Sequence, residues 1–310
     1  MRGSQATGSK ATLLVVNPEA GKGKGRRCFE QLRPELLRHF PGLTIRVTEY
    51  PGHAETIGRE ARRQSFRRIL SIGGDGTPYE IINGLLQGKK PPLDIELGMI
   101  PAGTGNSFIR DFSPIDPAQV LANIVAGRRQ KVDLIEFSQN SRDGRRQRRF
   151  FINILGIGLI ADILQLTNEK LKFLGAAGYS LAVLVRLARR MRNEIIVRCG
   201  NKREVFHDSA LVISNSRFTG GKMMIAPQAD AGDGQVDLVI FNEVNRRDIL
   251  AIFRRVFSGR HLDHRQVLTR RASEVTITST PPLQLMADGE LLGKTPLRLK
   301  VWPRALTALL

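Results

Sequence analysis

The sequence has few cysteines and no long apolar run, and each scarcity excludes a class of protein. Its two cysteines, Cys28 and Cys199, stand far apart and match no spacing of a zinc site or a disulfide framework. That usage is typical of a reducing compartment. The longest uncharged apolar stretch, residues 173–185, is too short to cross a bilayer, and no signal peptide opens the chain. We therefore expect a cytoplasmic protein that is not integral to a membrane.

Aromatic and acidic residues are scarce as well. One Trp and three Tyr in 310 residues leave few side chains for stacking on nucleic-acid bases. Lys and Arg number 48 against 29 Asp and Glu, which gives a formal net charge of +19. This charge attracts polyanions, whether nucleic acid, lipid headgroups or nucleotide phosphates, and is also compatible with a basic solvated surface. The 41% of hydrophobic residues suffices for a folded core, which excludes global disorder.

The first 130 residues alternate strand and helix patterns. Short β-branched apolar runs predict strands at residues 12–17, 43–49, 68–72 and 96–100, and apolar positions at helical spacing fill the intervals. Such alternation is typical of a mostly parallel sheet with helices on both faces. Ligands bind such sheets outside the carboxyl ends of the strands, and three glycine-rich segments of this chain follow those ends.

After about residue 130, strands dominate the pattern. They are predicted at residues 132–137, 150–155, 194–199, 209–215, 236–241, 267–270, 274–279 and 283–287. Two helices are predicted among them, at residues 169–192 and 246–258. This half therefore indicates an antiparallel β-rich domain with helical insertions.

The segment Gly73-Gly74-Asp75-Gly76-Thr77-Pro78-Tyr79-Glu80 follows the third predicted strand. Its consecutive glycines let the backbone approach a phosphate. We expect Thr77 to cap the next helix, Pro78 to occupy its first position and Glu80 to complete a capping box. The helix N-terminus would then face an anion, and Asp75 would hold a divalent cation beside it. The alternative is a tight strand–helix turn with a surface aspartate.

Two further segments follow predicted strands at the same edge of the sheet. Asn17-Pro18-Glu19-Ala20-Gly21-Lys22 is similar to a phosphate loop but does not fit the pattern G-x-x-x-x-G-K-[ST], because Gly23 follows Lys22. Residues 101–107, Pro-Ala-Gly-Thr-Gly-Asn-Ser, repeat the arrangement of strand, glycine-rich turn and helix. Three such loops at one edge predict a nucleotide pocket more strongly than any one of them does.

Three segments of the second half carry less specific patterns. Asp288-Gly289-Glu290 forms a turn that could supply a general base, although its spacing favours a plain hairpin corner. The acidic loop of residues 230–235 could seat Mg²⁺ or Ca²⁺, or could be a solvated turn. Residues 156–161 fit the dinucleotide pattern G-x-G-x-x-[GA], but no acidic residue follows about twenty positions on, so we interpret them as strand–helix packing.

Together these motifs resemble the diacylglycerol kinase catalytic-domain family, which includes soluble bacterial lipid kinases, sphingosine kinases and ceramide kinases. The resemblance is carried by Asn17-Pro18-x-x-Gly21, Gly73 to Thr77 with Glu80, Pro101 to Asn106 and Asp288-Gly289-Glu290, in the family's order. It implies an N-terminal α/β domain related to NAD kinase and a C-terminal antiparallel β-sandwich, with ATP in the cleft between them. Residues 11–130 would form the nucleotide-binding domain, to which residues 300–310 could return, and residues 131–299 the β-rich lipid-substrate domain.

The resemblance also implies functional residues. ATP contacts are implied for Asn17, Pro18, Glu19, Ala20, Gly21, Lys22, Thr48, Gly74, Asp75, Gly76, Thr77, Pro78, Tyr79, Glu80, Gly103 and Thr104. A general base is implied at Glu290, supported by Asp288, with Asp75 as a third catalytic group. Bacterial members of the family hold a structural Mg²⁺ in the loop that matches Asp230 to Gln235. Here Asp233 would be its side-chain ligand, and the flanking ligands, at Asp230 and Gln235, would be mostly backbone oxygens.

The chain departs from the family's pattern at two places. Pro78-Tyr79 replaces an aliphatic residue and an asparagine, which changes the contacts available to phosphate or metal. Sphingosine kinases carry an aspartate that binds the substrate amine where this chain has Leu164. A sphingoid amine is therefore not the expected substrate.

We predict an ATP- and Mg²⁺-dependent kinase that phosphorylates a hydroxyl of a diacylglycerol-like or related lipid. One alternative is an NAD kinase-like nucleotide kinase, although the chain lacks the Thr-Gly-Ser-Thr-Ala-Tyr type of segment that those enzymes carry. Another is a non-catalytic basic module that binds membrane or nucleic acid, in which nucleic-acid binding would depend steeply on salt. The scarcity of aromatic residues does not favour nucleic acid as a partner, and a homodimer stays open.

Two of the predicted helices indicate how such a kinase would meet its substrate in a membrane. Residues 169–192 and 246–258 each carry an apolar face with arginines offset from it. These arginines are Arg186, Arg189 and Arg190 in the first helix and Arg246, Arg247, Arg254 and Arg255 in the second. Each could contribute about 1 kcal/mol near anionic lipid. We expect peripheral, salt-sensitive binding to an anionic membrane surface; the alternative is that both apolar faces fill the core of the β-rich domain.

Overall fold

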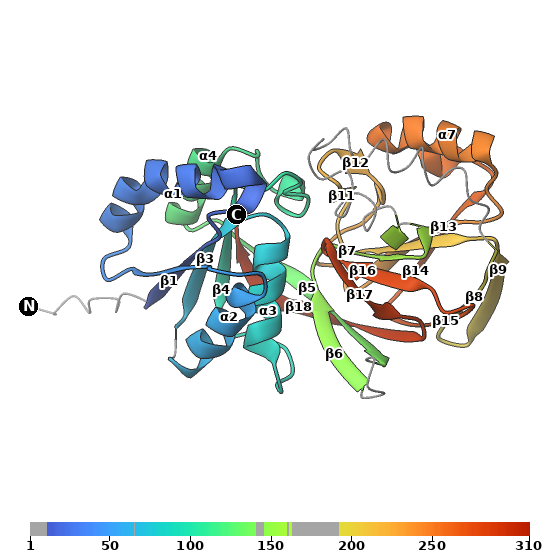
Figure 1. Ribbon diagram of the computed structural model, residues 1–310, viewed down its shortest axis with the longest axis horizontal. Helices are drawn as coiled ribbons and strands as arrows, with labels where there is room; N and C mark the ends of the chain where they lie inside the picture. Colours follow the sequence, from blue (N-terminus) through green and yellow to red (C-terminus); the bar gives the residue numbers. More distant parts are fainter. Residues whose placement is uncertain (1–10, 65, 141–145, 160, 163–191) are drawn as a thin grey trace, which may run out of the picture. The chain divides into compact units, whose positions relative to one another are not determined.

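The computed structural model describes residues 11–64, 66–140, 146–159, 161–162 and 192–310, and it divides into two compact units (Figure 1). The first unit contains the described residues up to Gly103, together with Asp116–Gln130 and Leu306–Leu310. The second unit contains Thr104–Ile115 and the described part of Lys131–Ala305. Each unit has its own buried core, so each is described separately.

A parallel sheet forms the centre of the first unit. Its strands are β1 (Thr12–Val16), β2 (Thr44–Val47), β3 (Arg68–Gly73) and β4 (Glu96–Pro101), in the order β2-β1-β3-β4. The end of β18 (Leu297–Leu309) adds a parallel strand beside β4 and pairs Thr307 with Glu96. Every residue of β1 and β4 is buried, because helices cover both faces of the sheet.

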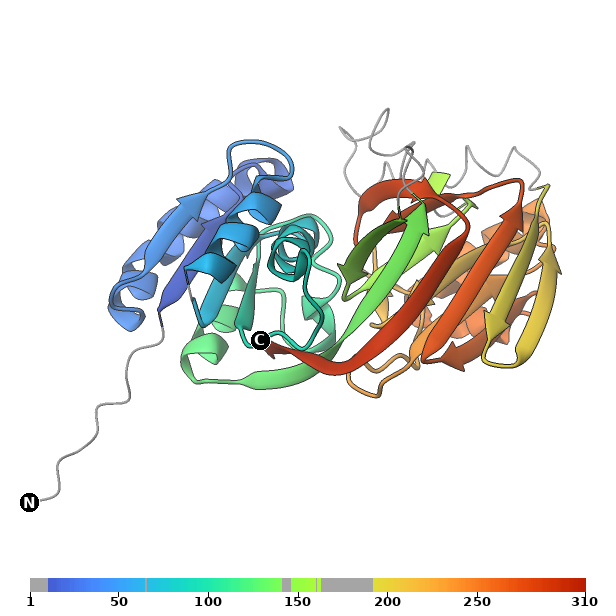
Figure 2. The same ribbon diagram turned by 90° about the horizontal axis from the view of Figure 1, so that it is seen from below.

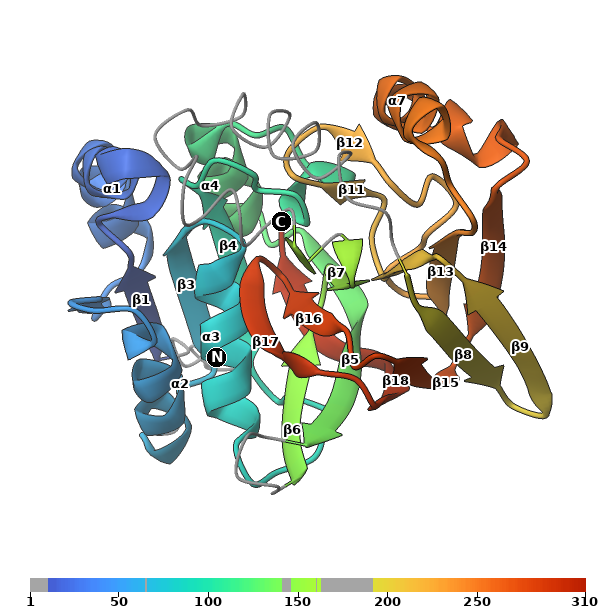
Figure 3. The same cartoon turned by 45° about the vertical axis from the view of Figure 1, so that its right-hand side comes forward.

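Two pairs of helices cover this sheet. Helices α1 (Ala20–His39) and α4 (Pro117–Val125) contact each other on one face, and α2 (His53–Arg63) and α3 (Gly76–Leu86) contact each other on the opposite face (Figures 1 and 3). Helix α4 begins where the Asp116 carboxylate accepts the backbone N–H of Gln119, with Pro117 in its first turn. The regular part of α1 begins only after Gly23, because residues 21–23 have positive φ angles.

The second unit contains two sheets that lie face to face (Figures 2 and 3). In one, β18 pairs with β5 (Arg129–Asn140) and with β15 (Glu274–Thr280), and β6 (Arg146–Phe151), β8 (Glu194–Cys199) and β9 (Lys202–His207) extend it. The other is antiparallel, in the order β14-β13-β10-β7-β16-β17. Its strands are β14 (Val267–Ala272), β13 (Val236–Phe241), β10 (Ala210–Ser214), β7 (Ile154–Ile157), β16 (Gln284–Ala287) and β17 (Glu290–Lys294).

Short elements complete the second unit. They are the 3₁₀ turns η1 (Ile109–Asp111), η4 (Val256–Ser258) and η5 (Arg260–Asp263), the strand pair β11 (Phe218–Thr219) and β12 (Met223–Met224), and helix α7 (Arg246–Arg255). Asn245 and Asp248 form a capping box at the start of α7. Ile252 and Val256 are buried in a core cluster with Val212 and Val239 of the six-stranded sheet.

The fold class expected from the sequence is confirmed, but the β-rich half needed corrections. Residues 150–155 are not one strand: β6 ends at Phe151 and β7 begins at Ile154. There the backbone N–H groups of residues 152–154 donate to the carboxylate of Asp288 instead of to a neighbouring strand. The sequence patterns missed β9, β17 and β18, whose exposed polar positions obscure their apolar residues. The predicted helix at residues 169–192 lies outside the described residues, except for its last residue.

Candidate functional site

Three glycine-rich segments meet at the carboxyl edge of the parallel sheet in the first unit. A β-carbon added at Gly21, in the loop after β1, would overlap the carbonyl oxygen of Ala102, just after β4. A β-carbon at Gly74, after β3, would lie 3.2 Å from the Cα atom of Gly103. The Ala102 N–H also donates to the Gly73 carbonyl at 2.8 Å. These close approaches between loops explain the glycines and bring together the segments that the sequence singled out.

The loop after β1 has an unusual backbone. Gly21, Lys22 and Gly23 have φ angles of 58°, 62° and 83°, in the left-handed region. Such runs direct successive backbone N–H groups toward one place and are suited to bind anions. The loop is tied to the sheet by the Asn17 N–H, which donates to the Ile72 carbonyl at 2.9 Å. Lys22 is an exposed residue of this loop, so the loop offers both backbone donors and a cation to a phosphate.

The turn between β3 and α3 differs from its predicted capping. Helix α3 begins at Gly76 after Asp75, so Thr77 lies inside its first turn and is not the N-cap. The Thr77 hydroxyl instead accepts the Asn17 side-chain amide at 3.3 Å. The predicted capping box is therefore wrong, and the contact between Asn17 and Thr77 joins two of the three loops. In the first turn of α3, the Thr77 N–H donates to the Gly74 carbonyl at 3.0 Å, the Tyr79 N–H donates to the Asp75 carbonyl at 3.3 Å, and Pro78 has no N–H, so this turn faces the edge mainly with the positive end of its helix dipole.

Glu80 does not complete a capping box of its own helix. Its carboxylate accepts the backbone N–H of Gly52 at 3.1 Å and of Ala54 at 3.0 Å, at the N-terminus of α2. Glu80 thus caps a neighbouring helix and holds the loop between β2 and α2 against α3. Thr48 begins that loop, and its N–H donates to the Val16 carbonyl at 2.8 Å, so Thr48 also lies at the carboxyl edge.

The structure places most of the residues implied for ATP at this edge. Asn17 to Lys22, Thr48, Gly74 to Glu80 and Gly103 belong to the first unit, whereas Thr104 begins the second. Asp75 is partly exposed at the start of α3, where a carboxylate could hold a divalent cation that arrives with a nucleotide. The side chains of Thr77 and Tyr79 are buried, at 3% and 4% exposed, so they line the core rather than the surface.

Asp288 lies in the two-residue turn between β16 and β17, in the second unit, and Glu290 is the first residue of β17. Asp288 and Gly289 have φ angles of 47° and 94°, as a tight Asp-Gly hairpin turn requires. The hairpin corner expected from the spacing is thus confirmed. Asp288 is 3% exposed, and its carboxylate accepts the backbone N–H groups of Ile152, Asn153 and Ile154 at 2.9–3.1 Å. Glu290 is exposed.

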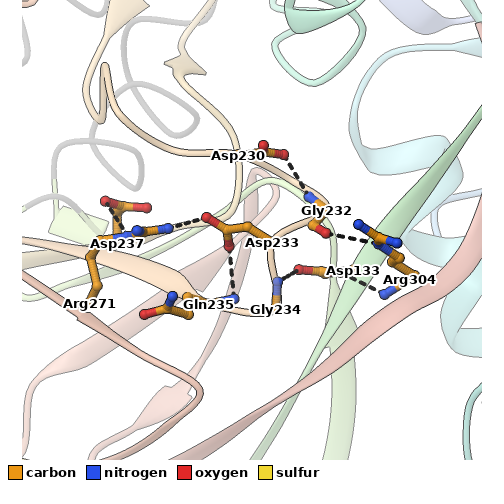
Figure 4. A network of polar contacts seen from close by, with 9 residues as sticks. All are labelled: Asp133, Asp230, Gly232, Asp233, Gly234, Gln235, Asp237, Arg271 and Arg304. Atoms are coloured by element: carbon orange, nitrogen blue, oxygen red, sulfur yellow. Dashed lines mark hydrogen bonds and ion pairs between the residues drawn. The ribbon is translucent and has the colours of Figure 1, made fainter.

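The acidic loop of residues 230–235 precedes β13. Its carboxylates bind the loop itself: Asp230 accepts the Gly232 N–H, and Asp233 accepts the Gln235 N–H, both at 2.9 Å (Figure 4). Asp233 also forms an ion pair with Arg271. In the described part of the chain, no group of three or more His, Cys, Asp or Glu side chains is placed to hold a metal ion. As they stand, these residues do not fit the implied structural Mg²⁺.

Two buried aspartates support this loop. Asp133 is fully buried, and burial raises the pKa of its carboxyl group. Asp237 is 6% exposed, and burial raises its pKa to about 6, although the Arg271 guanidinium opposes that shift. The sequence patterns did not single out either aspartate, because each lies within an apolar strand pattern and comes to lie near the loop only in the folded structure.

An apolar cavity in the second unit was not predicted. It lies between the six-stranded sheet and α7, and the space between the atoms that line it, much of which is open to solvent, is about 690 Å³. Sheet residues Ile154, Val212 and Phe241 line one side, and Ile252 and Phe253 line the other. The wholly buried strands β7, β10 and β13 were the available sign, because strands buried on both faces need a second apolar layer.

A buried histidine supports the cavity. His261 is 0% exposed, and its Nε2 donates to the carbonyl of Ile225, a cavity residue, at 3.0 Å. Its Nδ1 is buried without a hydrogen-bond partner among the described residues. Burial lowers the pKa of this ring, because the charged imidazolium would lose its hydration.

Other sequence hypotheses can be placed as well. Gly156, the first glycine of the dinucleotide pattern, lies within β7, paired with Val212 and Met286, and so is not in a loop that follows a strand. Leu164 lies outside the described residues. No helix in the described ranges is both long and apolar enough to cross a membrane.

Two family profiles match the chain. The profile described as "Diacylglycerol kinase catalytic domain" matches residues 11–137, and the one described as "YegS C-terminal NAD kinase beta sandwich-like domain" matches residues 153–310. YtlR of Bacillus subtilis, named provisionally as a lipid kinase, is 30% identical over 310 residues, which cover 95% of this chain and 97% of YtlR. A diacylglycerol kinase of Staphylococcus carnosus is 29% identical over 93% of this chain and 90% of its own length.

Solved structures share the fold. A provisionally named diacylglycerol kinase of Bacillus anthracis has a TM-score of 0.79 at 22% identity, with 100% of this chain and 98% of that chain covered. Yeast NADH kinase, solved with NADH, has a TM-score of 0.53 at 11% identity, with 97% and 83% covered. The α/β unit and the β-rich unit are therefore arranged along the chain as in these kinases.

Proposed function

The chain belongs to the family of the diacylglycerol kinase catalytic domain, and from that premise we propose that it transfers the γ-phosphoryl group of ATP to a hydroxyl group of a lipid. Membership makes it a kinase of this family. The lipid acceptor, the use of ATP with Mg²⁺ and the residue roles are the content of the proposal. It is supported by one observation: the chain has both an edge where three glycine-rich loops meet, in its first unit, and an apolar cavity, in its second unit.

The nucleotide phosphates would bind at the carboxyl edge of the parallel sheet. Phosphoryl transfer requires positioning and neutralisation of charge on the phosphate oxygens more than covalent chemistry. The left-handed loop after β1 and the side chain of Lys22 would supply donors and positive charge there, and the N-terminus of α3 would add the positive end of its helix dipole. Asp75 would hold the Mg²⁺ that accompanies ATP, and that ion would supply further neutralisation of the phosphate charge.

The acceptor would place its acyl chain in the apolar cavity. The cavity is lined almost entirely by aliphatic and aromatic side chains, and each buried CH₂ group of a chain would contribute about 0.8 kcal/mol. A nucleotide such as NAD has no comparable apolar part, so the cavity favours a lipid over the NAD kinase alternative. Glu290, exposed at the hairpin tip, would take the proton of the attacking hydroxyl group. Asp288 would hold the hairpin in place through its three backbone hydrogen bonds.

The test is an assay with radiolabelled ATP and Mg²⁺ against diacylglycerol, monoacylglycerol, ceramide and sphingosine in mixed micelles, and against NAD. We expect label in a lipid other than sphingosine and none in NADP. Absence of any labelled lipid would refute the lipid acceptor, and formation of NADP would establish the nucleotide kinase instead. Cavity variant Val212→Trp, with Val205→Trp on the exposed strand β9 as its control, should lower turnover of long-chain lipid selectively.

We further propose that helix α7 binds the enzyme to anionic membrane. Ile252 and Val256 are buried in the core of the second unit, so one apolar face of this segment packs inside the β-rich domain, as the alternative interpretation expects. Its outer side exposes Leu250 and, in η4, Phe257, at 37% and 48%. The arginines at its other exposed positions are Arg247, Arg254 and Arg255. Apolar residues among arginines are suited to the interface of an acidic bilayer.

Vesicle flotation tests this membrane contact. The protein should bind vesicles that contain anionic lipid, lose binding as salt rises and bind neutral vesicles little. Replacing the three arginines by Gln should weaken both binding and activity on vesicles, but not activity on a short-chain soluble lipid. Equal binding to neutral and anionic vesicles would contradict the proposal. Salt-sensitive binding to nucleic acid without any kinase activity would support the non-catalytic alternative.

A further inference from the structure

The loop of residues 230–235 is held by groups of the protein itself. Asp230 and Asp233 each accept the N–H group two residues further along, at Gly232 and Gln235. Such turns fix a loop locally and use one oxygen of each carboxylate. The second oxygen of Asp233 can therefore bind a partner outside the loop. A positively charged partner there would neutralise the negative charge of this acidic segment.

That partner is Arg271 (Figure 4). Arg271 lies on β14 directly opposite Asp237 of β13 in the antiparallel register, so strand pairing places it beside the loop. Its Nη2 forms an ion pair with the Asp233 carboxylate, and its Nε lies 3.6 Å from Oδ1 of Asp237, whose side chain is 9% exposed. One guanidinium therefore faces two carboxylates, one from the loop and one from the strand that follows it.

The backbone N–H and carbonyl groups of the loop also form hydrogen bonds with groups of the protein. The Asp133 carboxylate accepts the Gly234 N–H at 2.7 Å and the Arg304 N–H at 2.6 Å. The carbonyl oxygen of Ala231 accepts the Asp133 N–H at 2.6 Å, and that of Gly232 accepts Nε of Arg304 at 3.2 Å. Both of these carbonyl oxygens thus accept a hydrogen bond from protein donors.

We propose that the Arg271 guanidinium takes, in this chain, the place beside Asp233 and Asp237 that a divalent cation would otherwise hold. A divalent cation such as Mg²⁺ needs about six oxygen ligands, and none of the arrangements above leaves such a set. Arginine instead meets two carboxylates through a rigid, permanently charged fork of donors. The loop and the sheet edge beside it are therefore stable without a metal ion. This inference concerns the second unit and does not depend on the proposed reaction.

Thermal unfolding of the full-length protein, without nucleotide, tests the inference. The wild-type melting temperature should be the same in EDTA, in Mg²⁺ and in Ca²⁺. Arg271→Gln removes the charge and leaves two facing carboxylates, so its melting temperature in EDTA should fall by roughly 2–4 °C for each kcal/mol lost. Adding Mg²⁺ or Ca²⁺ should restore part of that loss, because the vacated place attracts a cation. Arg271→Lys, which keeps the charge, should remain insensitive to both ions.

Arg270→Gln is the matched control. Arg270 is the neighbouring residue of the same strand and forms an ion pair of similar exposure with Glu204, its Nη2 lying 2.6 Å from Oε1. Among the residues that the structure describes, Arg270 forms an ion pair with this one carboxylate, so its replacement should lower the melting temperature without any recovery in Mg²⁺. A general effect of divalent ions on the protein would appear equally in both variants.

Three results would overturn the inference. A wild-type melting temperature that falls in EDTA would show that a metal ion is bound despite Arg271. An Arg271→Gln variant that melts like the wild type would show that the guanidinium does not stabilise the loop. A destabilised Arg271→Gln variant that gains nothing from Mg²⁺ or Ca²⁺ would make Arg271 an ordinary ion-pair partner. If Arg271→Gln does not fold in EDTA, refolding in Mg²⁺ takes the place of the melting measurement. Recovery of folded protein then supports the inference, and no recovery contradicts it.

Discussion

The Glu80 carboxylate accepts the backbone N–H of Ala54, 26 residues before it in the chain, at 3.0 Å and so caps the N-terminus of a neighbouring helix. This contact ties the first turn of α3, which follows the glycine-rich turn, to the N-terminus of α2. Carboxylates at helix N-termini satisfy free N–H groups and interact favourably with the helix dipole. The edge of the sheet where the three glycine-rich loops meet therefore depends on a contact between two helices as well as on its glycines.

Replacing Glu80 by Ala should destabilise the first unit by about 1–2 kcal/mol, the usual cost of a lost helix cap. It should also raise KM for ATP, because the loop that begins at Thr48 is no longer held against α3. Calorimetry and ATP titrations would measure both effects. Glu30→Ala, at an exposed position of α1, is the control and should change neither. A normal melting temperature in Glu80→Ala would contradict the capping role.

Replacing Asp75 by Asn should lower kcat by about 10²-fold or more, because the carboxylate that we propose to hold Mg²⁺ is lost, and with it the positive charge that would neutralise the phosphate oxygens in the transition state. The melting temperature should stay close to wild type, because Asp75 is partly exposed and the substitution keeps its size. Asp94→Asn, at an exposed aspartate ahead of β4, should retain full activity. Steady-state kinetics at varied Mg²⁺ concentrations would measure this loss. A kcat close to that of the wild type would show that Asp75 takes no part in the mechanism.

Asp288 and Glu290, two residues apart, should behave in opposite ways. Asp288→Asn places an amide against a backbone N–H group in a buried site, so it should lower stability by at least about 2 kcal/mol. Glu290→Gln should leave stability unchanged and lower kcat by ~10²–10⁴-fold as the general base. Denaturant unfolding and kinetics on both variants separate the roles. An inactive Asp288→Asn variant of wild-type stability would exchange them.

Gly21 and Gly23 provide a matched pair in the loop after β1. Both have positive φ angles, but only at Gly21 would a β-carbon meet the backbone of the third loop, whereas nothing lies within 4 Å at Gly23. Gly21→Ala should therefore separate the loops and lower kcat/KM for ATP by ~10–10²-fold. Gly23→Ala should cost only the strain of a left-handed backbone, about 1 kcal/mol of stability. Equal effects of the two substitutions would argue against loop contact as the reason for Gly21.

His261 should make the second unit sensitive to acid. Its pKa is lowered by burial, so between that value and the ordinary value near 6.5 the unfolded state binds more protons than the folded state. Stability therefore falls as pH drops below about 6.5. His261→Gln, whose amide can still donate to Ile225, should lose this part of the pH dependence, as measured by melting curves from pH 8 to pH 5. His39→Gln, at an exposed position, should follow the wild type. A His261→Gln curve parallel to wild type would contradict a buried neutral imidazole.

Features that depend on neighbouring residues could be predicted from the amino-acid sequence. Alternating apolar runs gave the parallel sheet, glycines after three of its strands marked the ligand edge, and Asp288-Gly289 specified the hairpin, because backbone conformation at each place follows from a few adjacent residues. The order of the motifs that this chain shares with the family could also be recognised from the sequence alone.

The hydrogen-bond or ion-pair partner of each polar side chain depends on tertiary packing and could not be predicted from the sequence. Glu80 binds the N-terminus of α2 rather than its own helix, Asp288 binds residues more than 130 positions away, and Arg271 faces Asp233 through the register of two strands. A carboxylate or guanidinium binds whichever donor or acceptor the packing brings within about 3 Å. That choice depends on helix packing and strand register across the whole unit, which local sequence does not specify.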